Sequence, residues 1–142
     1  HVFAAYPIWA GCLLSGAHMV LPTPAGYRGE GVFDNFWKLI DRWNATFVCT
    51  VPTAAAALLQ RPVGDSDIST LNGAFCGSAP LPIELFKRFQ EVTGVEIIEG
   101  YGLTEATCLV SCNPKDGQRK VGSVGIPLLI CEGRRGPASV TL

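Results

Sequence analysis

The sequence predicts an α/β fold in which helices and strands alternate and build a mostly parallel sheet that is covered on both faces. Three short apolar segments are predicted to be buried strands, at residues 46–50, 71–76 and 95–99. Segments with helical spacing separate them, and parallel strands need such crossovers. Strands that are apolar at nearly every position are typical of sheets buried on both faces. The 142 residues suffice for one hydrophobic core.

The first third of the chain is expected to form two helices and a strand. A short helix is predicted over residues 7–15 and a strand over residues 17–21. The next helix ends near Asn44 and is indicated by an amphipathic stripe. That stripe consists of five apolar residues at three- and four-residue spacing, Phe33, Phe36, Trp37, Ile40 and Trp43.

Prolines and a glycine mark the later helices. Pro52 opens an alanine-rich helix over residues 53–60, and Pro62 stops it. Pro82 begins the following helix, which Gly94 closes. Four apolar residues of this helix are expected to face the core, Leu85, Phe86, Phe89 and Val92. The polar residues 113–121 are predicted to form a solvated loop.

Composition excludes several classes of function. The net charge of −1 and the pI near 6.1 give no basic surface, so nucleic acid is not an expected partner. No charged residue occurs from Val2 to Tyr27, but prolines and glycines interrupt this stretch, which favours a buried helix and strand over a membrane span. The six cysteines include no Cys-x-x-Cys pair and are expected to be reduced thiols of a cytoplasmic protein.

Groups suited to a nucleotide follow the strand at residues 95–99. They lie in the Tyr101 segment (residues 99–105), which reads Glu-Gly-Tyr-Gly-Leu-Thr-Glu. Its two glycines let a base or a phosphate approach the backbone. Tyr101 can cover a purine face, Thr104 can donate a hydrogen bond to a phosphate, and Glu105 can bind a hard cation. The same residues also fit a plain strand-end loop in which Thr104 caps a helix and Glu105 is solvated.

A second glycine-containing bend follows the strand at residues 71–76. This Gly77 turn (residues 77–80) reads Gly-Ser-Ala-Pro. Ligands of parallel sheets collect beyond the carboxyl ends of the strands, so the Gly77 turn and the Tyr101 segment are expected to meet at one edge. An ordinary turn before a helix that begins with proline explains the Gly77 turn as well.

The pattern Tyr-Gly-x-Thr-Glu after a strand resembles the signature of the adenylate-forming, or AMP-binding, enzyme superfamily. Three other segments resemble landmarks of that superfamily in the same order: residues 1–3 (His-Val-Phe), 76–82 (Cys-Gly-Ser-Ala-Pro-Leu-Pro) and 122–127 (Gly-Ser-Val-Gly-Ile-Pro). Among subfamilies, the chain is most similar to fatty-acyl and related acyl-CoA synthetases. Residues 1–128 are then the central part of the N-terminal AMP-binding domain, and residues 129–142 a divergent tail that is expected to fray.

The resemblance implies a role for each candidate residue. Tyr101 stacks beside adenine, Thr104 contacts the α-phosphate and Glu105 binds Mg²⁺. The opposite wall of the adenine slot is formed by Gly77, Ser78 and Ala79, while Glu99, Gly100 and Gly102 complete the nucleotide site. His1 borders the substrate carboxylate and the acyl pocket, so Thr104, Glu105 and His1 are the expected catalytic residues.

The resemblance also implies the reaction. A fatty or related carboxylic acid and ATP give acyl-AMP and pyrophosphate, and the acyl group then passes to CoA. The chain shows no phosphate loop ending in Pro-Lys-Gly, no Gly-Asp ribose segment and no lysine-bearing lid. We therefore expect it to need the remainder of a parent enzyme and to be inactive alone. An amino-acid adenylation domain, or a non-catalytic module that binds nucleotides or partners, are the alternatives.

Overall fold

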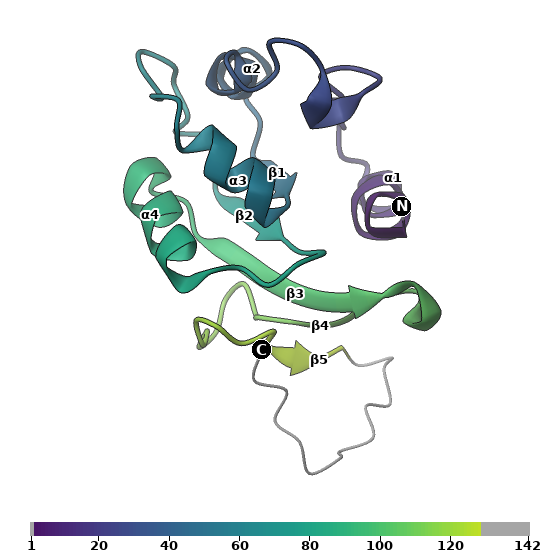
Figure 1. The fold of residues 1–142 in the computed structure, drawn as a ribbon. Coiled ribbons are helices and arrows are strands. Elements are labelled where there is room, and N and C mark those ends of the chain that lie inside the picture. Colours follow the sequence, from purple (N-terminus) through teal and green to yellow (C-terminus); the bar gives the residue numbers. More distant parts are fainter. Residues whose placement is uncertain (1, 129–142) are drawn as a thin grey trace.

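The computed structural model describes residues 2–128 and contains a five-stranded sheet with helices on both faces (Figure 1). The spatial order of the strands is their chain order: β1 (Phe47–Thr50), β2 (Gly73–Cys76), β3 (Ile97–Leu103), β4 (Cys108–Cys112) and β5 (Ile126–Pro127). The pairs β1–β2 and β2–β3 are parallel, whereas β4 and β5 continue the sheet in antiparallel fashion. The predicted α/β class and the three parallel strands are confirmed. The two antiparallel strands are an addition that the sequence did not indicate.

Three helices cover one face of the parallel strands. They are α2 (Phe36–Trp43) before β1, α3 (Pro52–Leu58) between β1 and β2, and α4 (Ile83–Thr93) between β2 and β3. The buried cluster joins them to the sheet and includes Phe36, Trp37, Ile40, Leu58, Ala74, Cys76, Phe89 and Ile97. Successive side chains of a strand point to opposite faces, so Ala74 and Cys76 face these helices and Phe75 faces away.

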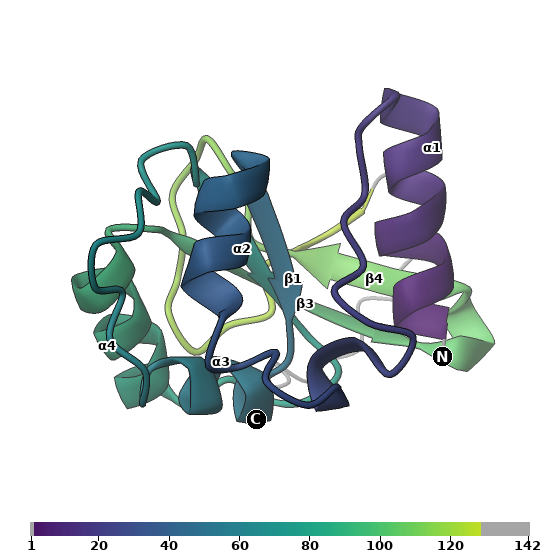
Figure 2. The ribbon, with the colours of Figure 1, turned by 90° about the horizontal axis from the view of Figure 1, so that it is seen from above.

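The N-terminal helix covers the opposite face. It consists of a π-helical part η1 (Ala4–Ala10) and the helix α1 (Gly11–Ser15), and it stands apart from α2 when the molecule is seen from above (Figure 2). The ring of Phe3, directly before η1, stacks on Phe75 with 5.7 Å between the ring centroids. The helix begins before the predicted residue 7 and accommodates Pro7, whose missing N–H fits a locally widened turn.

The strand predicted at residues 17–21 is wrong. These residues form an irregular connection after the left-handed Gly16, and they pair with no strand of the sheet within residues 2–128. Leu21 is 70% exposed, so its apolar character does not reflect burial in this unit. A strand needs a neighbouring edge that completes its hydrogen bonds, and local sequence does not report such an edge.

Two apolar helical residues that the sequence predicts to face the core lie at its margin. Val92 is 44% exposed and Trp43 is 46% exposed, although Phe89 and Trp37 on the same helices are buried. His18 packs edge-on against the Trp43 ring, and the Arg42 guanidinium lies over it. Both residues are the last apolar positions of their helical stripes, at the C-terminal end of each helix.

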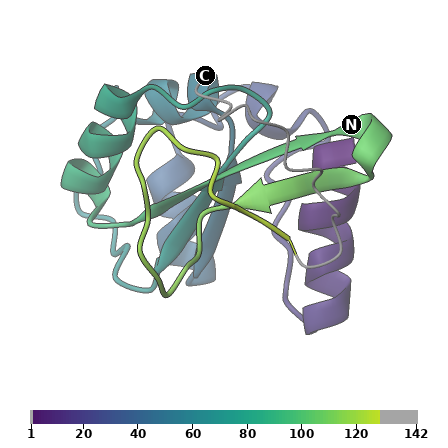
Figure 3. The ribbon, with the colours of Figure 1, turned by 90° about the horizontal axis from the view of Figure 1, so that it is seen from below.

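The polar residues 113–121 belong to a loop between β4 and β5, drawn in yellow-green in Figure 3. The buried Asn113 holds this loop, because its amide Nδ2 donates to the Ser123 carbonyl at 2.5 Å and its Oδ1 accepts from the Lys120 N–H at 3.3 Å. Arg119 forms an ion pair with Glu96 at 2.6 Å, next to the start of β3. Among the helices of residues 2–128, none combines the length and apolar character that crossing a bilayer demands.

Candidate nucleotide-binding site

The Gly77 turn and the Tyr101 segment lie side by side, as the sequence predicts. Cys76, the last residue of β2, is the register partner of Glu99 in β3. One residue further on, a Cβ atom added to Gly77 would lie 3.5 Å from the carbonyl oxygen of Gly100. The two segments are therefore in van der Waals range at the carboxyl end of the parallel strands.

The Tyr101 segment is a hairpin rather than the predicted loop. Strand β3 continues to Leu103 and pairs with β4, with an irregular register between Tyr101 and Gly102. The short 3₁₀ turn η3 (Thr104–Ala106) then forms the tip (Figure 1). The hairpin requires Gly102, because a Cβ atom there would overlap the Cys108 carbonyl. Sequence reasoning missed this pairing because Gly100 and Gly102 lower the expectation of a strand.

The hairpin and the turn present their functional groups to solvent. Tyr101 is 42% exposed, and Thr104 and Glu105 are exposed at the hairpin tip. Ser78 and Ala79 are exposed on the Gly77 turn, where Ser78 adopts a left-handed backbone with φ of 68°. A non-glycine residue in this region is strained, and such strain is found at functional turns. The arrangement leaves an aromatic ring, a hydroxyl and a carboxylate accessible beside a sharp backbone turn.

An aromatic pair packs directly beneath the two glycines. A Cβ atom on Gly77 would lie 3.2 Å from the rings of both Phe3 and Phe75, and one on Gly100 would lie 2.6 Å from Phe75. A side chain at Gly100 would therefore displace the Phe75 ring, and one at Gly77 would require both rings to shift slightly. Sequence reasoning did not assign Phe3 or Phe75 to the site. The alternation of side chains along β2 could have indicated Phe75, because it places Phe75 on the face opposite Ala74 and Cys76.

Glu99 differs from the other candidates because its side chain points into the protein. The residue is only 8% exposed, and its carboxylate Oε1 accepts a hydrogen bond from the backbone N–H of Leu81 at 3.1 Å. Burial raises the pKa of the Glu99 carboxyl, and the Leu81 hydrogen bond opposes that rise. Burial also raises the pKa of the neighbouring Cys76 thiol to about 12, with a further contribution from the Glu99 charge.

The described residues offer a modest site for a metal. No group of three His, Cys, Asp or Glu side chains within residues 2–128 could enclose an ion. Glu105 is the one acidic residue of the hairpin from Gly100 to Cys112. Mg²⁺ is commonly held by one or two carboxylates together with waters and substrate phosphates, so a single exposed carboxylate fits it. His1 and the tail at residues 129–142 lie outside the described residues.

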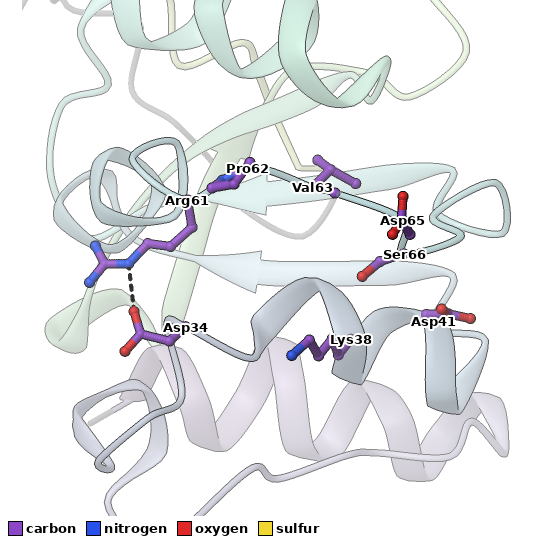
Figure 4. Close-up of a pocket in the computed structure, with 9 residues that line it drawn as sticks. Asp34, Lys38, Asp41, Arg61, Pro62, Val63, Asp65 and Ser66 are labelled. Atoms are coloured by element: carbon purple, nitrogen blue, oxygen red, sulfur yellow. Dashed lines mark hydrogen bonds and ion pairs between the residues drawn. The ribbon is translucent and has the colours of Figure 1, made fainter.

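A surface cavity of the described part of the chain lies away from these segments. It has a volume of about 470 Å³ and is bounded by α2 and residues 61–66 (Figure 4). Its walls carry charges of both signs, and Arg61 forms an ion pair with Asp34 at 3.0 Å across one end. Neither the Gly77 turn nor the Tyr101 segment contributes a lining residue.

Comparison with known families identifies the chain. A family model described as AMP-binding enzyme matches residues 1–134. The chain belongs to the AMP-binding enzyme family. Curated relatives of this AMP-binding chain are CoA ligases by name. A marinolic acid–CoA ligase of a Pseudoalteromonas species is 42% identical over 80% of the chain and 17% of its own length. An oxalate–CoA ligase of Arabidopsis thaliana is 33% identical over 89% of the chain and 25% of its own length.

Solved structures agree with the fold and the family. The anthranilate CoA ligase AuaEII in complex with anthranoyl-AMP superposes with a TM-score of 0.77 and 31% identity, over 89% of this chain and 24% of that one. Apo MatB from Rhodopseudomonas palustris gives a TM-score of 0.76 and 29% identity, over 90% of this chain and 24% of that one. The AMP-binding chain thus spans about a quarter or less of the length of these relatives.

Proposed function

We propose that the protein is an ATP-dependent acyl-CoA synthetase and that residues 2–128 carry its adenine, α-phosphate and Mg²⁺ contacts. The observation that carries this proposal is the van der Waals approach of Gly77 to Gly100, which sets two glycine-containing segments side by side. The CoA-ligase names of the relatives support the reaction class. The anthranoyl-AMP in the AuaEII structure supports an acyl-adenylate as the intermediate.

Each residue has a proposed role in binding ATP. Gly77, Ser78 and Ala79 form one wall for adenine, because only small residues let a flat ring lie against the backbone. Tyr101 covers the other side of the base. Gly100 and Gly102 flank Tyr101 and let the backbone lie close to the base. Thr104 donates its hydroxyl to the α-phosphate, and Glu105 at the hairpin tip holds Mg²⁺. When bound, Mg²⁺ neutralises phosphate charge.

Positioning is the main task of these residues in the first half-reaction. The carboxylate oxygen of the acid attacks the α-phosphorus of ATP, and the bond to the bridging oxygen of pyrophosphate breaks. Both reactants are anions, so the site must align them and offset their repulsion rather than supply a protein nucleophile. The thiol of CoA then attacks the acyl carbon, and AMP leaves with the electron pair of the broken C–O bond.

The proposal extends to parts that the structure does not describe. His1 borders the acyl pocket and the substrate carboxylate, and CoA and a fatty or related carboxylic acid are the co-substrates. The remaining groups for phosphate, ribose and thioester chemistry come from outside residues 1–142, so this chain alone is inactive. A cytoplasmic location completes the proposal.

Acid-dependent exchange of pyrophosphate into ATP tests the proposed function. The full-length gene product is assayed with a panel of fatty, aromatic and short-chain acids and with the twenty amino acids. Exchange with one of the carboxylic acids, followed by acyl-CoA formation when CoA is added, is expected. Exchange with an amino acid alone would instead identify an amino-acid adenylation domain, and exchange with no compound would contradict the proposal.

A further inference from the structure

The side chain of Glu99 connects the two segments of the candidate site. Leu81 follows the Gly77 turn by one residue, and Glu99 immediately precedes Gly100. The hydrogen bond from the Leu81 N–H to Glu99 Oε1 at 3.1 Å therefore ties the end of the turn to the start of the hairpin. The two bonded residues are 18 positions apart in sequence, so no local backbone constraint replaces this bond.

The bond lies in a place where its loss is costly. Glu99 is 8% exposed and Leu81 is 5% exposed, so water cannot easily take over as a partner. A buried N–H that loses its acceptor keeps the full cost of its desolvation with no compensating hydrogen bond. The Leu81 N–H also stands just before α4, whose N-cap residue Pro82 offers no side-chain cap. The Glu99 carboxylate thus accepts the hydrogen bond of the buried Leu81 N–H at the end of the Gly77 turn.

The backbone of Glu99 is fixed independently of its side chain. Its carbonyl accepts from the N–H of Asn113 at 3.0 Å, and Cys76 is its register partner in β2. The turn is held less firmly, since the Gly77 N–H reaches the Thr50 carbonyl at 3.4 Å. Removing the carboxylate should therefore move the turn and leave the strand in place.

We propose that Glu99 is a positioning residue, which sets the separation of the Gly77 turn from the Tyr101 segment through Leu81. This inference deepens the proposed function and rests on it. It differs from a role as a nucleotide ligand, because the carboxylate oxygen that it uses is bonded to the protein. This role requires an acceptor oxygen at hydrogen-bonding distance from the Leu81 N–H, and it does not require the negative charge.

Three substitutions in the full-length protein separate these roles. Glu99→Gln keeps an acceptor oxygen at the same reach and loses the charge. Glu99→Asp keeps the charge and withdraws the oxygen by one methylene, whereas Glu99→Leu removes the acceptor at similar volume. Glu91→Leu on the exposed surface of α4 is the matched control. The readouts are AMP affinity by calorimetry, KM for ATP and kcat in the exchange assay, and the melting temperature.

Glu99→Leu and Glu99→Asp are expected to weaken AMP binding and to raise KM for ATP, by roughly tenfold for Glu99→Leu. Glu91→Leu should stay within about twofold of wild type, and Glu99→Gln should lose clearly less AMP affinity than Glu99→Leu. A purely structural role would lower kcat with the folded fraction and leave AMP affinity of the folded protein unchanged. If Glu99→Leu does not fold, Glu99→Asp decides.

Three results would overturn the inference. Unchanged AMP affinity in Glu99→Leu, or in Glu99→Asp if Glu99→Leu does not fold, would exclude a positioning role. A loss in Glu99→Gln as large as that in Glu99→Leu would show that the charge itself acts on the nucleotide. A wild-type protein that binds AMP but exchanges no acid would contradict the proposed function alone, and one that binds no AMP would contradict both.

Discussion

Glu105→Gln in the full-length protein is expected to lower the rate of acid-dependent pyrophosphate exchange by about 100-fold or more. Glutamine matches the size and the hydrogen-bonding capacity of glutamate but lacks the negative charge. Glu105 is exposed at the tip of the β3–β4 hairpin and is its one acidic residue, so no neighbour on that hairpin can replace it. The exchange assay at saturating ATP and a range of Mg²⁺ concentrations measures the loss.

Glu91→Gln is the control for this substitution, because it removes an exposed carboxylate from α4 at a distance in sequence from both candidate segments. It should exchange at the wild-type rate. A Glu105→Gln protein with an unchanged rate at every Mg²⁺ concentration would show that Glu105 does not hold the metal.

Gly102→Ala is expected to destroy the hairpin. A methyl group at this position would overlap the Cys108 carbonyl and crowd Leu109, and both contacts are with backbone that cannot rotate away. The strands must separate or the register must change, at a cost of roughly 4 kcal/mol or more. Since Tyr101, Thr104 and Glu105 all belong to this hairpin, AMP binding should be lost together with thermal stability. Calorimetry and thermal denaturation of the full-length protein give both quantities.

Gly11→Ala provides the matched comparison. Gly11 has helical backbone angles, and the nearest atom to an added Cβ is the Tyr6 carbonyl oxygen at 4.0 Å. Alanine should therefore be neutral or slightly stabilising there. Wild-type melting and AMP binding in Gly102→Ala would mean that the close approach of β3 and β4 is not required.

The parallel part of the fold could be predicted because its signals are local. Pro52 and Pro82 mark helix starts, and the left-handed Gly94 closes α4, as the sequence indicated. The antiparallel part could not be predicted in this way. The pairing of β3 with β4 depends on the absence of side chains at Gly100 and Gly102, and glycine normally lowers the expectation of a strand.

The candidate site was predictable in its residue types and not in all its contacts. The meeting of the Gly77 turn with Gly100 follows from strand order alone. The inward path of the Glu99 side chain does not, since its partner is a backbone N–H 18 residues away. The stacking of Phe3 on Phe75 likewise depends on how the N-terminal helix crosses the sheet, which no local pattern reports.

Photolabelling with 8-azido-AMP, followed by mass-spectrometric mapping of the modified peptides, tests most directly whether adenine binds between the Gly77 turn and the Tyr101 segment. We expect the label to attach within residues 77–80 or 99–105 of the full-length protein and excess AMP to prevent it. Labelling confined to the cavity walls at residues 34–41 and 61–66, or to any surface remote from both segments, would contradict it.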